Sequence, residues 1–532
     1  MKKKPPPRPI APEVPGRDPG AAIGPRPGGS PFPALREIRD PRRPYLVPLL
    51  LLLATRLVAW RILPFASEDA YITFRFARNL AGGHGLVYNP GEPVFGFSSP
   101  LWTLWCALGV ALTHAPELWT RLTTLLADAL TLLVAGRMLE DEGADGAGSR
   151  APAWCFGVFF AVWPFFAAVA ASGMENSAML ALIAVAAATV RRAAAGPAPA
   201  GGGWRPALTG VLLAALALWR PEGIVAASVV ALGVRMRDRL VAVAIFAAGM
   251  VALTLYFGSP VPQSVLAKSS LYGTPGPWAA RYWWSWLVPA FTAAGPSIGE
   301  TRMLFPLAVL TGPALLAGAA ALWRARSRPV TLFAAACLSV WLGYALLGVA
   351  FFYWYLVVPL GGVAALACVG LPRIVRGRWL YAGAALLVAS SWLDAYPLYV
   401  GRAQNEFYGF AATADWLAKN ARPGEKVLLE PIGMVGWRAP VVVVDEVGLV
   451  SPTVARRRLQ GPGWYSDVAS SERPDWIVVR RGLLAGDAVF AGAGAPFRSL
   501  AERDSLFSRY ARETVMDEKT SGDNALVILR RR

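Results

Sequence analysis

Glu68 and Asp69 are adjacent acidic residues that directly follow a long apolar segment, in the stretch SEDAYITFRFARNL (67–80). Ionisable side chains at a lipid boundary are costly, so their presence there indicates a function. A carboxylate in such a place can act as a general base that removes the proton from an attacking hydroxyl group. An acid is also a common residue in the first turn of a helix. Catalysis and helix capping therefore both remain open for this pair.

Three further titratable side chains follow the acids. Arg75 and Arg78 are three residues apart, so on a helix they would share a face and could bind an anionic group or reach lipid headgroups. His84 lies in AGGHGLVYNPGE, where glycines and an Asn-Pro-Gly turn predict irregular backbone. Such backbone persists at membrane depth only where it packs on protein or lines a wet cavity. The loop 66–98 is therefore predicted to be catalytic, with His84 contacting substrate or supporting the loop.

Other predicted loops carry further candidates. Arg220 and Glu222 lie in WRPEG, where they could bind substrate or simply pair with each other. Lys268 lies in VPQSVLAK, and a fixed cation there could neutralise a leaving phosphate. Tyr353 and Tyr355 belong to FFYWY, whose rings could stack on a sugar or prenyl chain or form an interfacial aromatic belt.

The composition identifies an integral membrane protein. Of the 532 residues, 55% are hydrophobic and 16% are charged, which is too apolar for an ordinary soluble protein. The net charge of +18 does not indicate nucleic-acid binding, because the basic residues lie mostly in short loops between apolar runs. The four cysteines lie in apolar segments without metal-ligand spacing, and there are only two histidines. We therefore predict no metal and no cofactor.

Basic loops set the expected topology. The Pro-rich basic tail 1–43 should be disordered and cytoplasmic. A transmembrane domain, 44–395, should contain about eleven transmembrane helices. Within it, 99–136 should cross once and add one re-entrant or interfacial helix. The motif loops then lie on the outer face. The other predicted spans are 45–65, 152–171, 174–190, 240–257, 303–323, 330–348, 353–370 and 379–395, and two short ones share 206–234.

Residues 396–532 have a different pattern. A helical stretch, 408–420, precedes the strand-like runs KVLLE, PVVVVDE, DWIVV and ALVIL. Continuous apolar runs such as VVVV suggest strands that are buried on both faces. We expect a small exported α/β domain here.

Taken together, these motifs resemble the GT-C class of polyprenyl-phosphate-dependent glycosyltransferases. The acidic doublet, GHGLVYNPGE and SSPLW are most similar to the terminal arabinofuranosyltransferases of actinobacterial cell walls and their uncharacterised relatives. SGMEN, which contains Glu175, resembles the SG-x-E motif of that group, and WRPEG resembles its RP-[DE]-G motif. VPQSVLAK resembles PN-x-x-x-AK, with Gln263 in place of Asn. EPIGMVGW with VVVVDEVGLVSP resembles the exported C-terminal segment of the group.

The resemblance implies an enzyme of the bacterial inner membrane. It would move a sugar, arabinofuranose in the nearest relatives, from a polyprenyl-phosphate donor to a cell-envelope glycan or lipid. An acid of the first outer loop is the catalytic base in the GT-C class, which carries over to Asp69 or Glu68. The doublet is Asp-Asp in many relatives, so the departure at Glu68 favours Asp69. One base and one displacement would invert the anomeric centre.

The resemblance also implies how the leaving phosphate is stabilised. Arg75, Arg220 and Lys268 are the candidate cations for it, and they would make a metal unnecessary. Glu175 joins them as a substrate-binding candidate.

Two other classes of protein fit part of the pattern. A transporter or flippase of a lipid-linked saccharide would also have many spans with intramembrane charges, but it should show an internal repeat. A non-catalytic membrane scaffold would explain an exported domain, but it leaves the acids after the first span without a function.

Overall fold

The fold is described from a computed structural model that covers most of the chain. The described residues are 45–142, 151–194, 205–272, 308–325, 328–350, 352–375, 403–485, 494–517 and 522–532, with β1, β2 and a few isolated residues. Pro44–Arg532 form one compact unit, and the following description concerns that unit. The predicted tail 1–43 and most of the predicted span 379–395 lie outside the described residues.

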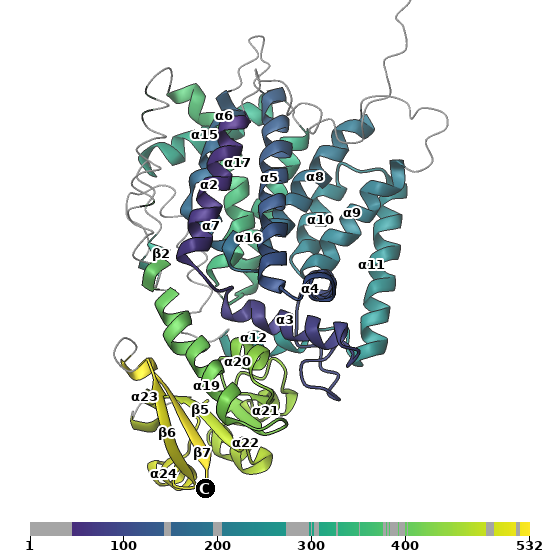
Figure 1. Cartoon of the computed structure of the whole chain (residues 1–532). Helices are drawn as coiled ribbons and strands as arrows, with labels where there is room; N and C mark the ends of the chain where they lie inside the picture. The colour runs from purple at the N-terminus through teal and green to yellow at the C-terminus, as the bar shows by residue number, and fades with distance from the viewer. Residues whose placement is uncertain are drawn as a thin grey trace, which may run out of the picture. The chain divides into compact units, whose positions relative to one another are not determined.

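Helices dominate the described chain before residue 400. Most of them stand side by side, whereas α3 lies across one end of the others and α4 is seen end-on (Figure 1). β1 (Ser297–Ile298) and β2 (Thr301–Arg302) form a small antiparallel pair. The helices are α2 (Leu46–Ile62), α3 (Glu68–Ala81), α4 (Pro100–Thr113), α5 (Pro116–Glu142), α6 (Ala151–Val162), α7 (Pro164–Ala171), α8 (Asn176–Ala194), α9 (Arg205–Trp219), α10 (Gly223–Ala231), α11 (Met236–Phe257), α12 (Gln263–Tyr272), α15 (Ala308–Ala325), α16 (Arg328–Leu347), η1 (Tyr353–Leu356) and α17 (Val357–Ile374).

The predicted count of about eleven spans is too high for the described residues. Four helices there are long and apolar enough to cross a membrane, or five if the bent pair α6–α7 counts as one span. The four are Pro116–Glu140, Met236–Phe257, Pro329–Leu347 and Trp354–Ile374. Within the described residues, the other predicted spans form helices near their predicted positions, but these do not meet the length and hydropathy requirements together. A helix of 14 residues such as α4 spans only about 21 Å, less than the roughly 30 Å of hydrocarbon.

The segment 99–136 contains one helix of span length and one short helix. α5 passes the length and hydropathy requirements, and α4 does not. The two helices run in different directions (Figure 1). This agrees with the expected pattern of one crossing and one additional helix.

The C-terminal region combines helices with one mixed sheet. The five strands lie in the order β4-β3-β5-β7-β6, in which β4, β3 and β5 are parallel and β7 and β6 are antiparallel. Each of the four strand-like runs forms a strand, and β3, β4 and β5 are mostly buried, as their continuous apolar character predicts. The elements are η2 (Asn405–Ala411), α19 (Ala412–Asn420), β3 (Lys426–Leu429), α20 (Ile432–Arg438), β4 (Val442–Asp445), α21 (Pro452–Arg458), α22 (Trp464–Glu472), β5 (Trp476–Arg480), α23 (Arg481–Ala485), α24 (Leu500–Phe507), β6 (Tyr510–Met516), η4 (Gly522–Asn524) and β7 (Leu526–Arg531).

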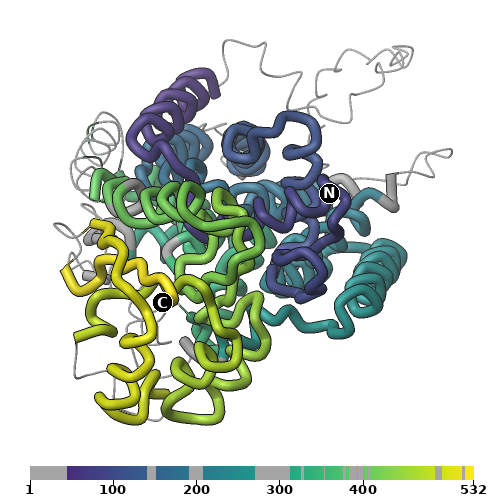
Figure 2. The backbone as a smooth tube through the Cα atoms, turned by 60° about the horizontal axis from the view of Figure 1, so that its bottom comes forward, coloured from purple at the N-terminus to yellow at the C-terminus, as the bar shows by residue number. Residues whose placement is uncertain are grey.

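The C-terminal region lies at the end of the helices where α3 runs. Figure 2 views that end and shows the region in front of the helices, covering only part of them. α20 packs on α3, and the helix α19 packs on α20. The carboxyl ends of β3 and β4 continue into segments that touch the first loop, so the sheet is oriented with this edge towards α3.

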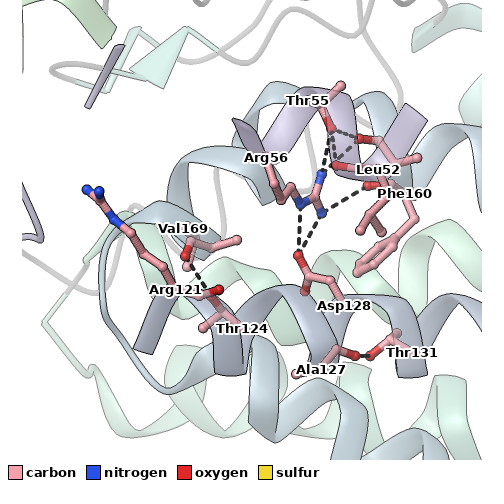
Figure 3. A network of polar contacts seen from close by, with 12 residues as sticks. Leu52, Thr55, Arg56, Arg121, Thr124, Ala127, Asp128, Thr131, Phe160 and Val169 are labelled. Carbon is pink, nitrogen blue, oxygen red and sulfur yellow. Dashed lines mark hydrogen bonds and ion pairs between the residues drawn. The ribbon is translucent and has the colours of Figure 1, made fainter. Parts of the chain in front are cut away.

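A buried ion pair stabilises the apolar helices (Figure 3). Arg56 of α2 donates from Nε and Nη2 to Oδ2 of Asp128 on α5, at 2.9 and 2.8 Å, and both side chains are almost fully buried. Its guanidinium also donates to the backbone oxygens of Phe160 and Ala161, at 3.4 and 2.8 Å. These carbonyls lie one turn before Pro164, where the helix bends by 54° between α6 and α7. Because proline has no N–H for the Phe160 carbonyl, Arg56 supplies donors that the broken helix lacks.

Removal of one member of this pair is expected to destabilise the protein more than removal of both. Asp128→Leu or Arg56→Met leaves a buried charge without its partner, which typically costs about 3–5 kcal/mol. The double variant should lose less stability than either single variant, as measured by thermal unfolding in detergent. An Asp128→Leu variant as stable as the unaltered protein would contradict this account.

Candidate active site

Asp69 and Lys268 bring a carboxylate and an ammonium group together from distant parts of the sequence. Asp69 lies in the first turn of α3, and Lys268 lies on α12. Asp69 Oδ2 and Lys268 Nζ are 3.7 Å apart, and the side chains are 29% and 25% exposed. Both groups are therefore partly open to solvent, and their separation exceeds a normal hydrogen bond. A substrate group could approach either side chain.

α12 is positioned by its first residue. The backbone N–H of Gln263 donates to the carbonyl of Phe95 in the first loop, at 2.7 Å. Its side-chain Nε2 donates to the carbonyl of Gly448 in the C-terminal region, at 3.0 Å. Gln263 thus connects three segments that are far apart in sequence. Five residues later, the same helix carries Lys268.

Lys268 is held as a cation. Burial lowers the pKa of its amine, but the neighbouring Tyr355 and Asp69 raise it, and the net direction is upward. Nζ also lies over the ring of Phe352, 4.5 Å from its centroid, which is a favourable cation–π position. A permanently charged ammonium beside a partly open carboxylate can bind an anionic group.

Arg220 has two carboxylate partners. It lies between α9 and α10, and its guanidinium donates to Glu175 and to Glu222. Tyr344 of α16 donates to the same Glu222 carboxylate, and the Arg220 guanidinium lies 4.8 Å from the centroid of the Tyr355 ring. The charge of Arg220 is more than balanced by these acids. Arg220, Glu222 and Glu175 thus form one ion-pair cluster, as the sequence allowed for Arg220 and Glu222, and their contact with substrate stays a prediction.

Glu68 is bound to the C-terminal region. Its two carboxylate oxygens accept hydrogen bonds from the backbone N–H groups of Gly433 and Met434, the latter at 3.0 Å. These N–H groups belong to the first turn of α20, where the helix itself provides no partners. Glu68 thus caps a helix other than its own, and its predicted catalytic role stays a prediction.

Arg75 and Arg78 also face the C-terminal region. Buried Arg75 donates to the carbonyls of Tyr88, Gly436 and Val441, at 2.8–2.9 Å, and to the Asn89 side chain at 3.1 Å. Arg78 donates to the carbonyls of Trp437 and Gly436 and lies 4.7 Å from the centroid of the Trp437 ring. In this structure both arginines therefore donate to protein acceptors, and their contact with substrate stays a prediction.

His84 and Tyr353 do not join the Asp69–Lys268 pair in the described structure. His84 is exposed beyond the carboxyl end of α3, whereas Asp69 lies in its first turn. The 14 residues of α3 extend over about 21 Å, so the two side chains lie at opposite ends. The side chain of Tyr353 lies outside the described part of the chain. Tyr355 is buried against Arg220 and stacks on Tyr344, with ring centroids 5.2 Å apart.

Several residues that build the site carry no recognisable signal in the sequence. Tyr344 lies inside an apolar run and becomes notable only because α16 places it against Glu222. Phe352 belongs to the recognised aromatic run, although its contact with Lys268 depends on the fold. Among the described residues, no group of three or more His, Cys, Asp or Glu side chains is placed to hold a metal ion.

Comparison with known proteins places the chain in a fold class. The structure is similar to that of ArnT from Cupriavidus metallidurans bound to undecaprenyl phosphate, with a TM-score of 0.56 and 12% identity over 90% of this chain and 97% of that chain. The apo state of the same protein gives a TM-score of 0.57, also at 12% identity, with the same 90% and 97% coverage. An oligosaccharyltransferase from Archaeoglobus fulgidus, in complex with zinc and sulfate, gives 0.53 at 12% identity over 86% and 71% of the two chains.

Sequence comparisons are less informative. Residues 398–523 match a family described as a domain of unknown function, DUF8728. No curated protein matches the chain. The structural likenesses show that the chain has the GT-C fold, as its motifs predicted.

Proposed function

We propose that the chain is a membrane glycosyltransferase that moves a sugar from a polyprenyl-phosphate donor to a hydroxyl group of a cell-envelope glycan or lipid. The GT-C fold supports the reaction class. The observation that carries the proposal is the approach of Asp69 to Lys268, 3.7 Å apart and partly exposed. This pair combines a proton acceptor with a cation for a phosphate, which are the two groups that such a transfer needs.

The proposed reaction is a single displacement. Asp69 accepts the proton of the acceptor hydroxyl as its oxygen forms a bond to the anomeric carbon. The bond between that carbon and the phosphate oxygen breaks, and the polyprenyl phosphate leaves with the electron pair. Lys268 stabilises the charge that develops on the phosphate. Attack opposite to the leaving phosphate inverts the anomeric centre.

Two kinds of observation support the choice of substrates. The similar ArnT structure contains undecaprenyl phosphate, which supports a lipid-linked donor with a phosphate at the membrane surface. The choice of arabinofuranose as the sugar, and of a cell-envelope acceptor, rests on the first-loop motifs. The partly exposed ring of Phe352, which lies against Lys268, is a suitable surface for the donor.

The proposed location is the bacterial inner membrane, with the C-terminal region on the outer face and the N-terminus in the cytoplasm. Apolar side chains are widely exposed on α2, α5 and α11, as expected for helices in lipid. α11 places Met236 at the end opposite to the one that leads into α12, and its 22 residues span about 33 Å. Met236 and the candidate site should therefore lie on opposite sides of the membrane.

This orientation predicts a labelling pattern. A cysteine at exposed Ser470 (Ser470→Cys) should react with an impermeant thiol reagent on intact spheroplasts, whereas Met236→Cys, also at an exposed position, should react only after permeabilisation. The four native cysteines are buried, so their background labelling should be small. The reverse pattern would show that the proposed orientation is wrong.

The proposed chemistry predicts different kinetic effects for the two central residues. Asp69→Asn keeps the side-chain shape but removes the proton acceptor, so kcat should fall by about 10²–10⁴-fold with little change in donor binding. Lys268→Met should weaken donor binding and also lower the rate, by roughly 10²–10³-fold. The assay is transfer from a polyprenyl-phosphate sugar to an acceptor by the purified protein.

A matched control is Asp415→Asn. This carboxylate pairs with Arg438 on the exposed face of the C-terminal region, so its loss should leave turnover unchanged. Near-full turnover of Asp69→Asn would exclude Asp69 as the base. If the unaltered protein transfers no sugar but moves a lipid-linked saccharide across vesicles, the transporter alternative would replace the present proposal.

A further inference from the structure

The first loop and α12 bind the C-terminal region through polar groups along one continuous interface. We define the C-terminal clamp as residues 432–448, which run from α20 to the loop after β4. Tyr88 donates to the carbonyl of Ile432, and Gln263 donates to that of Gly448, so both ends of the clamp are bound. The C-terminal partners of Glu68, Arg75 and Arg78 lie between these two ends.

Two glycines allow the clamp to approach α3 closely. A Cβ atom at Gly433 would lie 1.9 Å from the Glu68 carbonyl oxygen, and one at Gly436 would lie 1.9 Å from the Tyr88 hydroxyl. Both positions are on the face of α20 that packs on α3. A larger side chain at Gly433 would therefore push α20 away from the backbone of α3, and one at Gly436 would displace the Tyr88 hydroxyl and the Arg75 guanidinium.

Asn89 pairs with the edge of the C-terminal sheet. Its side-chain nitrogen donates to the carbonyl of Val443 at 2.9 Å, and its side-chain oxygen accepts from the N–H of the same residue at 3.1 Å. Val443 belongs to β4, the edge strand, which would otherwise expose unpaired backbone groups. The Asn89 side chain, from the first loop, thus pairs with the N–H and carbonyl groups of Val443 as the backbone of a neighbouring strand would.

We propose that the C-terminal clamp is a structural part of the catalytic centre and that Glu68 is a positioning residue that sets the direction of Asp69. The proposal rests on the proposed function only for the role of Asp69. Successive helical residues point about 100° apart, so a Glu68 side chain fixed to α20 turns Asp69 towards α12. This assigns a role to part of the region that matches the domain of unknown function.

The geometry explains why a tether is needed at this point. The first turn of a helix is its least constrained part, because its N–H groups have no partners within the helix. The carbonyl of Ser172 accepts from the N–H of Ser67, and Glu68 accepts from Gly433 and Met434, so the chain is fixed directly before Asp69. A displacement of 1 Å at a reacting group can cost about 10²-fold in rate.

Two variants test the clamp on the intact protein. Glu68→Gln keeps one acceptor oxygen but cannot accept from both N–H groups, and Gly433→Ala pushes α20 away from α3. Both should increase hydrogen exchange of amides in 68–80 and 432–441, while the exchange of β5 and β7 stays unchanged. Gly494→Ala is the control, because a Cβ there meets nothing within 4 Å. This control should change hydrogen exchange neither in 68–80 nor in 432–441.

Kinetics separate positioning from direct catalysis. Both variants should lower kcat by roughly 10–10²-fold, with unchanged donor KM and with the acid limb of the pH–rate profile retained, because the proposed base is still present. Loss of that acid limb in Glu68→Gln would make Glu68 the base and overturn the proposal. Unchanged hydrogen exchange in both variants would also overturn it. The hydrogen-exchange measurement needs no substrate. It therefore tests whether the clamp holds α3 in place even if the proposed reaction is wrong.

Discussion

A guanidinium group that is removed from water needs oxygen acceptors, and the position of Arg75 depends on this requirement. Burial lowers the pKa of Arg75, yet an arginine remains charged in a protein. Hydrogen bonds therefore have to offset the free energy that is lost when the charged group leaves water. The acceptors come from α3's own loop at Tyr88 and Asn89 and from the C-terminal region at Gly436 and Val441. The first loop and the C-terminal region can therefore be stable only together, and the candidate site is built on both.

The charged groups of the protein fall into two kinds by their surroundings. Arg56 and Arg220 are almost fully buried and each has carboxylate partners at hydrogen-bonding distance, as stability in an apolar region requires. Lys268 and Asp69 are partly exposed and are separated by more than a hydrogen bond. The stability of the fold alone does not explain why Lys268 and Asp69 are partly exposed and too far apart for a hydrogen bond. Their availability to a substrate is what distinguishes them from the structural pairs.

The sequence predicted the elements better than it predicted the site. Apolar runs and the helix break at WRPEG located the helices, because membrane helices depend on local composition. The acidic doublet led to Asp69, and the motif order led to the GT-C fold. The roles of Glu68, Arg75 and Arg78 were not predictable, because their partners lie more than 350 residues away in the chain. The span count failed because several apolar runs fold into helices shorter than a bilayer.

The distances from a bound donor to the two central residues test the account most directly. A cryo-EM structure of the protein with a non-hydrolysable polyprenyl-phosphate sugar and an acceptor would provide both. The account predicts that a phosphate oxygen lies within about 3 Å of Lys268 Nζ and that the acceptor hydroxyl lies within about 3 Å of the Asp69 carboxylate. A donor phosphate bound at another cation, with Asp69 distant from the acceptor, would contradict the account.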